Sequence, residues 1–479
     1  MYYKIRNDVL FRQYSGFGYL SDNSEFGYQF LNDNHLHPGE RYVSESGAVM
    51  LSTLDKEPRF IDDIVDELMQ IFIEVDRDEL KHDTMEFFDG LKDQGYLSRG
   101  KTADSCQDHA LFKITNMDNN DNENSALGTE NCGKGVIRPN DFLRSIHFEI
   151  ASACNERCVH CYIPHECKTK TIDSGLFYKI LEAGRELNII HVTLSGGEPL
   201  LHQDFVHFLE KCRDLDLSVN VLSNLTLLTD SIFTEMIKNP LLSVQTSIYS
   251  MDSSVHDSIT HLEGSLEKTK NAVIKLVSAG IPVQISCPIM KQNKNSFQDV
   301  IQWGKKHNIA VAMEPIIFAS YDHTGDNLAN RISLEDLGCV LDKQLQEGYA
   351  EFLHEAAIEK ESLTEDNPIC SVCRYSFCVS VEGNMFPCAG WQTNILGDLN
   401  SESLQDIWEL SPKIQNLRKI KRKDFLKCVK CKDRGYCTVC MMCNANENSD
   451  GNVFQINEFR CKAAEIVHRK VDGFFKDGQ

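Results

Sequence analysis

A chain of 479 residues with 42% hydrophobic side chains is long enough for roughly three domains with cores of their own. No apolar run approaches the roughly 20 residues of a membrane span, and the first residues lack the apolar core of a signal peptide. We therefore expect a cytoplasmic location and no membrane partner. The formal net charge of -22 argues against a nucleic acid partner, because binding phosphates depends on Lys and Arg. We interpret the basic run over 419–423 as a solvated helix end.

Residues 1–100 are predicted to form a small α/β unit. Strands are expected over 2–13 and 17–20, and helices over 44–54, 59–72 and 78–94, from their hydrophobic periodicity and turn residues. The next segment, 101–140, contains an almost wholly polar stretch at 116–124. Such a stretch buries too little apolar area to offset the entropy of ordering, so the pattern predicts a flexible linker.

Residues 141–335 alternate between short β-branched runs and helical stretches. This repeat predicts a parallel α/β sheet, partly or fully closed, with ligands at the carboxyl ends of its strands. The strands are expected over residues 146–152, 189–195, 218–223, 243–248, 283–288 and 310–316. The helices are expected over residues 174–187, 205–214, 230–238, 265–279 and 296–307. A helical bridge over 336–365 then leads into a cysteine-rich region over 366–479.

The chain contains 19 cysteines, and their clustering favours metal binding over disulfides in a reducing compartment. Cys154, Cys158 and Cys161 follow the first barrel strand with C-x3-C-x2-C spacing. Three thiolates in one loop can hold three irons of a [4Fe–4S] cluster and leave the fourth iron open. A zinc site is the alternative, with its fourth ligand from His165 or Cys167.

This spacing, with the aromatic residue Tyr162 directly after it, resembles the radical S-adenosylmethionine (SAM) superfamily. A second matching motif, Gly196-Gly197-Glu198-Pro199, stands at the end of the next strand. The resemblance implies a partial (β/α)6 TIM-like barrel with Cys154, Cys158 and Cys161 at the catalytic cluster. It also implies that SAM is bound by Tyr162, the Gly-Gly-Glu-Pro motif, Asn224 and Ser247. For Asn224 and Ser247, ordinary turn chemistry is the alternative.

The cysteines after residue 366 resemble the SPASM domain, whose pattern implies two auxiliary [4Fe–4S] clusters, three clusters in all. The resemblance assigns Cys370, Cys373, Cys388 and Cys440 to the first cluster, and Cys428, Cys431, Cys437 and Cys461 to the second. The spacing departs from the family after Cys437, so Cys378 and Cys443 are candidate substitutes. Zinc knuckles are the alternative, because C-x2-C pairs also suit zinc.

The size, position and order of elements in residues 1–100 resemble the winged-helix-like recognition element of enzymes that modify ribosomally made peptides (RiPPs). In that family a leader peptide adds a strand to the sheet edge. A DNA-binding winged helix is the alternative, but the acidic residues on the predicted helices oppose it.

Together the resemblances imply a SPASM-domain radical SAM peptide maturase. Such an enzyme cleaves SAM reductively, and the 5′-deoxyadenosyl radical takes a hydrogen atom from a precursor peptide. We expect an intramolecular thioether between a Cys sulfur and a carbon, of the ranthipeptide or sactipeptide type. The expected partners are a precursor peptide with its leader and an electron donor such as flavodoxin or ferredoxin. The alternatives are carbon–carbon crosslinking, a formylglycine-forming sulfatase-type maturase and a non-catalytic iron–sulfur protein.

Overall fold

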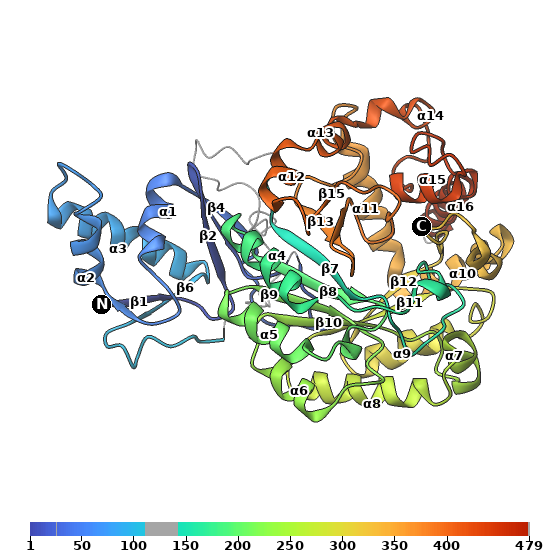
Figure 1. The fold of residues 1–479 in the computed structure, drawn as a ribbon, viewed down its shortest axis with the longest axis horizontal. Coiled ribbons are helices and arrows are strands. Elements are labelled where there is room, and N and C mark those ends of the chain that lie inside the picture. Colours follow the sequence, from blue (N-terminus) through green and yellow to red (C-terminus); the bar gives the residue numbers. More distant parts are fainter. Residues whose placement is uncertain (25, 111–141, 478–479) are drawn as a thin grey trace.

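The computed structural model describes residues 1–24, 26–110 and 142–477 (Figure 1). At the N-terminus, two antiparallel three-stranded sheets pack with helices around buried side chains such as Tyr3, Ile64 and Phe88. The first sheet has the order β5-β1-β6 and the second β2-β3-β4. Their strands are β1 (Tyr2–Ile5), β2 (Leu10–Tyr14), β3 (Phe17–Ser21), β4 (Glu40–Ser44), β5 (Arg59–Phe60) and β6 (Leu97–Gly100). The helices are α1 (Glu45–Ser52), α2 (Ile61–Leu68) and α3 (Arg77–Asp93).

Two of the predicted N-terminal elements have different bounds in the structure. The strand predicted over 2–13 is two strands in different sheets, because the chain turns at Arg6, which pairs with Asp8 at 2.9 Å. The helix predicted over 59–72 begins only at Ile61, since β5 pairs with β1. Both differences arise from pairing with distant segments, which local periodicity does not encode.

The first ten residues of the predicted linker are packed against the N-terminal unit. Cys106 is buried, and its thiol contacts the backbone oxygen of Ser98 at 3.4 Å. Asp108 pairs with Lys4 at 3.2 Å. The ordered unit therefore extends beyond residue 100, and most of the predicted linker lies outside the described residues.

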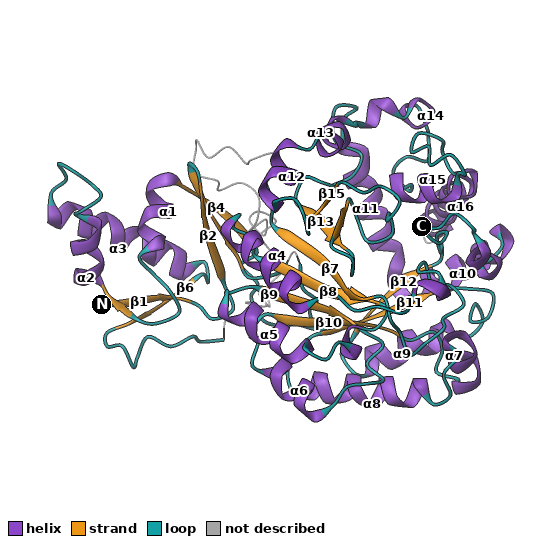
Figure 2. Ribbon diagram, in the orientation of Figure 1, coloured by secondary structure: helices purple, strands orange, loops and turns teal. Residues whose placement is uncertain are grey.

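A row of parallel strands, β7 to β12, forms the centre of the molecule in chain order (Figure 2). Along β7, Ile146 and Phe148 point toward the helices and join the main hydrophobic core, as the alternation of a strand requires. The strands are β7 (Ser145–Ala151), β8 (His191–Gly196), β9 (Ser218–Leu222), β10 (Leu242–Ser247), β11 (Val283–Pro288) and β12 (Ala310–Glu314). The helices are α4 (Ser174–Glu186), α5 (Phe205–Asp214), α6 (Asp230–Ile237), α7 (Ser253–Thr260), α8 (Ser265–Ser278) and α9 (Phe297–Lys306). The partial (β/α)6 barrel predicted from the sequence is confirmed.

The cysteine-rich region continues the barrel sheet. β13 (Ser376–Val379) pairs in parallel with β7, and β14 (Asn384–Phe386) and β15 (Gly397–Asp398) follow it antiparallel. β7 therefore pairs with β13 on the side where a closed barrel would pair it with β12. The helices of the bridge and this region are α10 (Leu334–Gln344), α11 (Ala350–Ser362), α12 (Leu404–Leu410), α13 (Pro412–Lys419), α14 (Leu426–Val429), α15 (Met441–Glu447) and α16 (Glu458–Asp477). In the described residues no helix has the length and apolar composition to cross a membrane.

The N-terminal unit contacts the amino ends of the barrel strands. Arg12 donates to the carbonyl of Ile189 at 3.0 Å, just before β8. Asn23 donates to the carbonyl of Leu241 at 3.4 Å, just before β10. The ring of Phe26 stacks on His191 with centroids 4.8 Å apart. β2 and the segment between β3 and β4 thus contact the end of the barrel opposite to the carboxyl ends of its strands.

Candidate active site

The cysteine loop follows β7 at the carboxyl end of the barrel. Its backbone is tied to the end of α7, where the N–H groups of Arg157 and Val159 donate to the carbonyls of Thr260 and Ile259 at 2.9 and 3.0 Å. The turn is completed by the N–H of Cys161, which donates to the carbonyl of Cys158 at 3.1 Å. These hydrogen bonds fix the loop, which holds Cys154, Cys158 and Cys161 at the carboxyl rim of the barrel.

The three thiols of this loop are half-buried and have few polar neighbours. The Cys158 thiol donates to Glu156 at 3.2 Å, and Sγ of Cys154 accepts from the N–H of Glu156 at 3.4 Å. Burial raises the pKa of Cys154 to about 11. A buried thiol becomes a thiolate readily only when a cation or metal compensates its charge, so this donor set fits an iron–sulfur cluster.

Cys167, the candidate fourth ligand for zinc, has a different neighbour. Its thiol lies near the hydroxyl of Tyr321, and the residue is exposed. His165 uses its carbonyl to accept from Arg157 at 2.7 Å.

The Gly-Gly-Glu-Pro turn at the end of β8 touches the backbone of the cysteine loop. Gly196 has φ +124°, and a Cβ at this position would lie 2.0 Å from the carbonyl oxygen of Ala151. A Cβ on Gly197 would lie 2.4 Å from the oxygens of both Ala153 and Ser152. The glycines thus permit the close approach of two protein backbones, and SAM binding by this motif stays a prediction.

Glu198 is fully buried and accepts several hydrogen bonds. Its Oε1 accepts from the Leu200 N–H at 2.9 Å and from Ser223 Oγ at 2.7 Å, and its Oε2 accepts from the Asn224 N–H at 2.8 Å. Burial raises the pKa of Glu198 to about 7, against the opposing effect of these hydrogen bonds. The carboxylate therefore fixes the end of β9 beside the end of β8.

Asn224 and Ser247 lie at the same rim and contact protein groups. Asn224 Nδ2 donates to Asn155 Oδ1 at 2.9 Å, and Asn155 in turn donates to Thr226 at 2.8 Å. Ser247 lies near Tyr249, whose hydroxyl lies 4.0 Å from Cys158 Sγ. Both predicted residues thus connect neighbouring strand ends to the cysteine loop. Asn155, Thr226 and Tyr249 were not among the predicted site residues, although all follow strands.

Tyr162 contacts a carboxylate that sequence reasoning also missed. Its hydroxyl donates to Glu149 Oε1 at 2.8 Å, and Gln392 of the cysteine-rich region donates to Glu149 Oε2. Glu149 is 3% exposed, and burial raises its pKa to about 7. Strand alternation places Glu149 on the face of β7 opposite to Phe148, which was the available signal. Through its hydrogen bonds with Tyr162 and Gln392, Glu149 connects the barrel to the cysteine-rich region beside the active site.

The cysteines assigned to the first auxiliary cluster are neighbours. Besides burial, the nearby thiols of Cys440, Cys370 and Cys373 raise the pKa of Cys388. Cys378 is fully buried beside Glu149 and Cys388, and the thiol of Cys443 lies beside that of Cys440. The structure thus gathers the expected four and places both candidate substitutes next to them.

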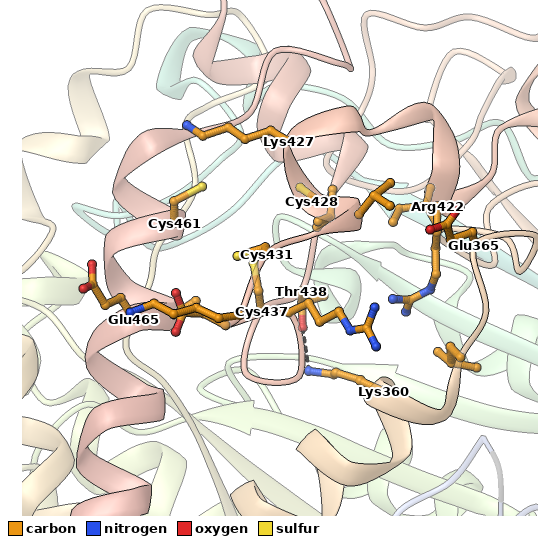
Figure 3. Close-up of a pocket in the computed structure, with 18 of the residues that line it drawn as sticks. Lys360, Glu365, Arg422, Lys427, Cys428, Cys431, Cys437, Thr438, Cys461 and Glu465 are labelled. Carbon is orange, nitrogen blue, oxygen red and sulfur yellow. Dashed lines mark hydrogen bonds between the residues drawn. The ribbon is translucent and has the colours of Figure 1, made fainter.

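The second group of cysteines lines a cavity of about 390 Å³ (Figure 3). Burial and then the neighbouring thiols of Cys461, Cys428 and Cys431 raise the pKa of Cys437 to about 11. Cys428 is in α14 and Cys461 in α16. Four half-buried thiols around one cavity fit a second auxiliary cluster. No three His, Cys, Asp or Glu side chains among the described residues are close enough to share a single metal ion.

Three protein families match successive parts of the chain. The Radical SAM superfamily matches residues 148–304, the SPASM iron-sulfur cluster-binding domain matches residues 370–444, and Coenzyme PQQ synthesis protein D (PqqD) matches residues 36–97. The first match covers β7 to α9, and the third covers β4 and the three N-terminal helices.

Characterised relatives share these regions at low identity. The chain is 23% identical over 284 residues to the PqqA peptide cyclase of Methylocella silvestris, covering 56% of this chain and 75% of that protein. It is 25% identical over 327 residues to the antilisterial bacteriocin subtilosin biosynthesis protein AlbA of Bacillus subtilis, covering 64% and 70%. In fold it resembles Streptococcus suis SuiB bound to precursor peptide SuiA, with a TM-score of 0.60 and 14% identity over 96% of this chain and 100% of that one.

A half-barrel with a three-cysteine loop at its carboxyl rim defines the class as a radical SAM enzyme. The chain is more specifically a radical SAM enzyme with a SPASM domain and an N-terminal PqqD-like domain. The resemblance to SPASM-domain radical SAM maturases inferred from the sequence is thereby confirmed.

Proposed function

We propose that this enzyme modifies a ribosomal precursor peptide and forms an intramolecular thioether from a Cys sulfur to a carbon. The observation that carries the proposal is that one chain combines a radical SAM barrel with a PqqD-like domain, and that the N-terminal unit packs against this barrel. Two relatives carry names that refer to a peptide cyclase and to bacteriocin biosynthesis. Both are consistent with a peptide substrate.

The N-terminal unit offers an edge for the leader peptide. β4 is the outer strand of its sheet and pairs only with β3 among the described strands. An extended peptide adds to such an edge through backbone hydrogen bonds. We propose that the leader pairs with β4 and thereby tethers the rest of the precursor to the barrel.

At the rim, the chain's own residues hold and orient the reacting groups. Cys154, Cys158 and Cys161 would hold the catalytic cluster, and the Glu198 network keeps the SAM-facing ends of β8 and β9 in place. When bound, the cluster and SAM supply the 5′-deoxyadenosyl radical that removes a hydrogen atom from the peptide. Glu149 and Tyr162 lie between this rim and the SPASM domain, where a proton released in crosslinking has an acceptor.

The two cysteine groups of the SPASM domain would complete a set of three [4Fe–4S] clusters. Forming a thioether from a thiol and a C–H bond removes a pair of hydrogens, so the second electron needs an acceptor. We propose that the auxiliary clusters accept it and that a flavodoxin or ferredoxin supplies the reducing electron in the cytoplasm.

Coexpression with a precursor peptide tests the proposal. A short Cys-containing peptide encoded beside this protein should lose a pair of hydrogens per crosslink, measured by mass spectrometry. A thioether should also remove one thiol from iodoacetamide labelling, whereas a carbon–carbon crosslink should leave every thiol reactive. The matched control replaces Cys154, Cys158 and Cys161 with alanine and should return the unmodified peptide.

The same experiment addresses the other candidate outcomes. A formylglycine product would carry an aldehyde that reacts with a hydrazide probe and would contain no crosslink. Release of no 5′-deoxyadenosine from the reduced enzyme and SAM would overturn the proposal entirely.

A further inference from the structure

The cavity at the second auxiliary cysteine group has an unusual balance of charge. Three acidic side chains line it, namely Glu365, Asp433 and Glu465. Six basic side chains line it, namely Lys360, Arg422, Lys427, Lys432, Arg434 and Lys462. The whole chain has the opposite balance, with 49 basic and 71 acidic residues. We call these six side chains the basic face.

Most of this positive charge is not neutralised within the protein. Asp433 is buried and its carboxylate is hydrogen-bonded to His468 at 2.8 Å. Lys427 has only a distant ion pair, 3.8 Å from Glu458. Within the described part of the chain, Lys432 and Lys462 have no ion pair.

Basic side chains also crowd one another inside the cavity. Lys360 extends toward the thiols and donates to Thr438 at 2.9 Å (Figure 3). Arg422 also lines this cavity, and its Nε is buried without a hydrogen-bond partner among the described residues. Burial and the nearby Arg434 lower the pKa of Arg422. A cluster held by the four thiolates is anionic and would offset part of this positive charge, and an acidic partner at the rim would offset more.

The basic face also presents apolar surface. Leu363 is 37% exposed and lines the cavity, and Leu426, directly before Lys427, is 84% exposed. The four thiols beneath are half-buried, so a cluster held by them would lie close to the surface. Charged rims that steer a partner around a small apolar contact suit weak, transient docking of electron-transfer proteins.

We propose that the basic face is the docking site of a small acidic one-electron carrier protein of the flavodoxin or ferredoxin class. This inference rests on the proposed function, because it assumes that Cys428, Cys431, Cys437 and Cys461 hold a cluster. One electron would pass from the reduced carrier through this cluster to the catalytic cluster. The carrier is oxidised, and the auxiliary cluster returns to the state in which it can accept the electron released from the peptide. No bond is made or broken in this transfer. The long-range attraction between a basic patch and an acidic carrier orients their encounter.

Charge reversal at the exposed rim tests the docking site. The double variant Lys432→Glu/Lys462→Glu changes two exposed lysines that line the cavity. The matched control Lys268→Glu/Lys306→Glu makes the same charge change on exposed positions of α8 and α9. Calorimetry with oxidised flavodoxin as the probe should show at least about tenfold weaker binding for the rim variant at low salt, and no such loss for the control. High salt should weaken binding to the unaltered protein and remove the difference.

Conservative replacement separates charge from side-chain shape and from cluster assembly. Lys432→Arg/Lys462→Arg should bind flavodoxin as the unaltered protein does. Iron content should be equal in all variants. In turnover, 5′-deoxyadenosine formation driven by flavodoxin should fall in the rim variant, while formation driven by dithionite should not change.

The outcomes are distinct. Equal flavodoxin affinity in the rim variant and the unaltered protein would overturn the docking site, and so would an equal loss in the barrel control. Loss of precursor-peptide affinity, with flavodoxin affinity unchanged, would identify the basic face as a peptide site instead. If dithionite-reduced, unaltered enzyme cleaves no SAM, then the proposed function fails, although the affinity measurement still decides the docking site.

Discussion

Two glycines at the end of β8 show how single residues determine the active-site rim. Gly197 donates its N–H to the carbonyl of Ala151 at 2.6 Å and packs directly on the backbone of the cysteine loop. No side chain fits between the two segments, because the obstructing atoms are backbone oxygens that cannot move aside alone. The cysteine loop therefore keeps its position only if the Gly-Gly-Glu-Pro turn has no side chain at Gly196 and Gly197.

Replacement of Gly197 by alanine should separate the two motifs. We expect Gly197→Ala to destabilise the fold by roughly 1–3 kcal/mol, because a Cβ would lie 2.4 Å from two carbonyl oxygens. Iron bound at the catalytic loop and affinity for SAM should fall with it. Chemical denaturation, iron analysis and SAM binding measure the three effects.

Gly90→Ala is the matched control for this change. Gly90 lies in α3, and a Cβ there would meet nothing within 4 Å. Alanine favours a helix over glycine by about 1 kcal/mol, so this variant should be neutral or slightly more stable. Unaltered SAM affinity in Gly197→Ala would contradict the steric account.

The buried carboxylate of Glu198 should make stability depend on pH. Burial raises its pKa to about 7 in the folded protein, above the ordinary value near 4.5. The unfolded state therefore releases its proton at lower pH, and the stabilising contribution of the protonated group is lost as pH rises through 7. Between pH 6 and pH 8 the free energy of unfolding should fall by about 1 kcal/mol from this residue.

The isosteric variant Glu198→Gln isolates this effect. It cannot ionise, so its free energy of unfolding should fall less steeply over the same range, measured by urea denaturation at each pH. It should also be less stable at pH 6, because its amide group faces the Asn224 N–H donor. Parallel pH profiles for the two proteins would contradict the raised pKa.

At the scale of single elements, β4 and β13 show two different uses of a strand edge. β13 adds to the open side of β7 and brings Cys378 and Cys388 toward the barrel. β4 keeps its outer edge unpaired among the described strands. An unpaired edge can form hydrogen bonds with a further strand. At β7 that strand is β13 of the same chain, and at β4 we propose that it is the leader peptide.

Hydrogen exchange on β4 tests the proposed leader site. Addition of a synthetic leader peptide should slow exchange of amides within Glu40–Ser44, because a new strand protects groups that now face outward. Amides of β3, already paired on both sides, should not change. Protection confined to the helices, with β4 unaffected, would show that the leader binds elsewhere.

At the scale of the whole molecule, the N-terminal unit and the active-site rim lie at opposite ends of the barrel. The segment between β3 and β4 contacts the amino ends of β8, β10 and β12, whereas the cysteine loop stands at the carboxyl end of β7. Figure 1 shows this unit beside the barrel, away from the SPASM domain. A bound precursor must therefore extend along the barrel from leader to reaction site.

The contacts between the N-terminal unit and the barrel should stabilise the barrel. We expect Phe26→Ala to destabilise the barrel by roughly 1–3 kcal/mol, because the partly buried ring stacks on His191. Hydrogen exchange should show faster opening of β8 as well as of the N-terminal unit. Phe352→Ala on α11 is the control, because that ring is 66% exposed and its loss should be neutral. Opening limited to residues 1–110 would contradict the coupling.

The sequence by itself determined the chemistry of the protein. Ligand spacing within one loop and strand–helix periodicity are local properties, so Cys154, Cys158, Cys161, the Gly-Gly-Glu-Pro turn and the βα repeat could all be recognised without coordinates. The SPASM domain was found in the same way, from the spacing of its cysteines.

Only the tertiary structure decided how distant segments meet. The pairing of β13 with β7, the contact of Gln392 with Glu149 and the basic face each join residues far apart in the chain. Hydrogen bonds between strands and between side chains depend on three-dimensional approach, which short-range periodicity does not record. For the same reason the run over 419–423, read as a solvated helix end, contributes Arg422 to a cavity lined by thiols.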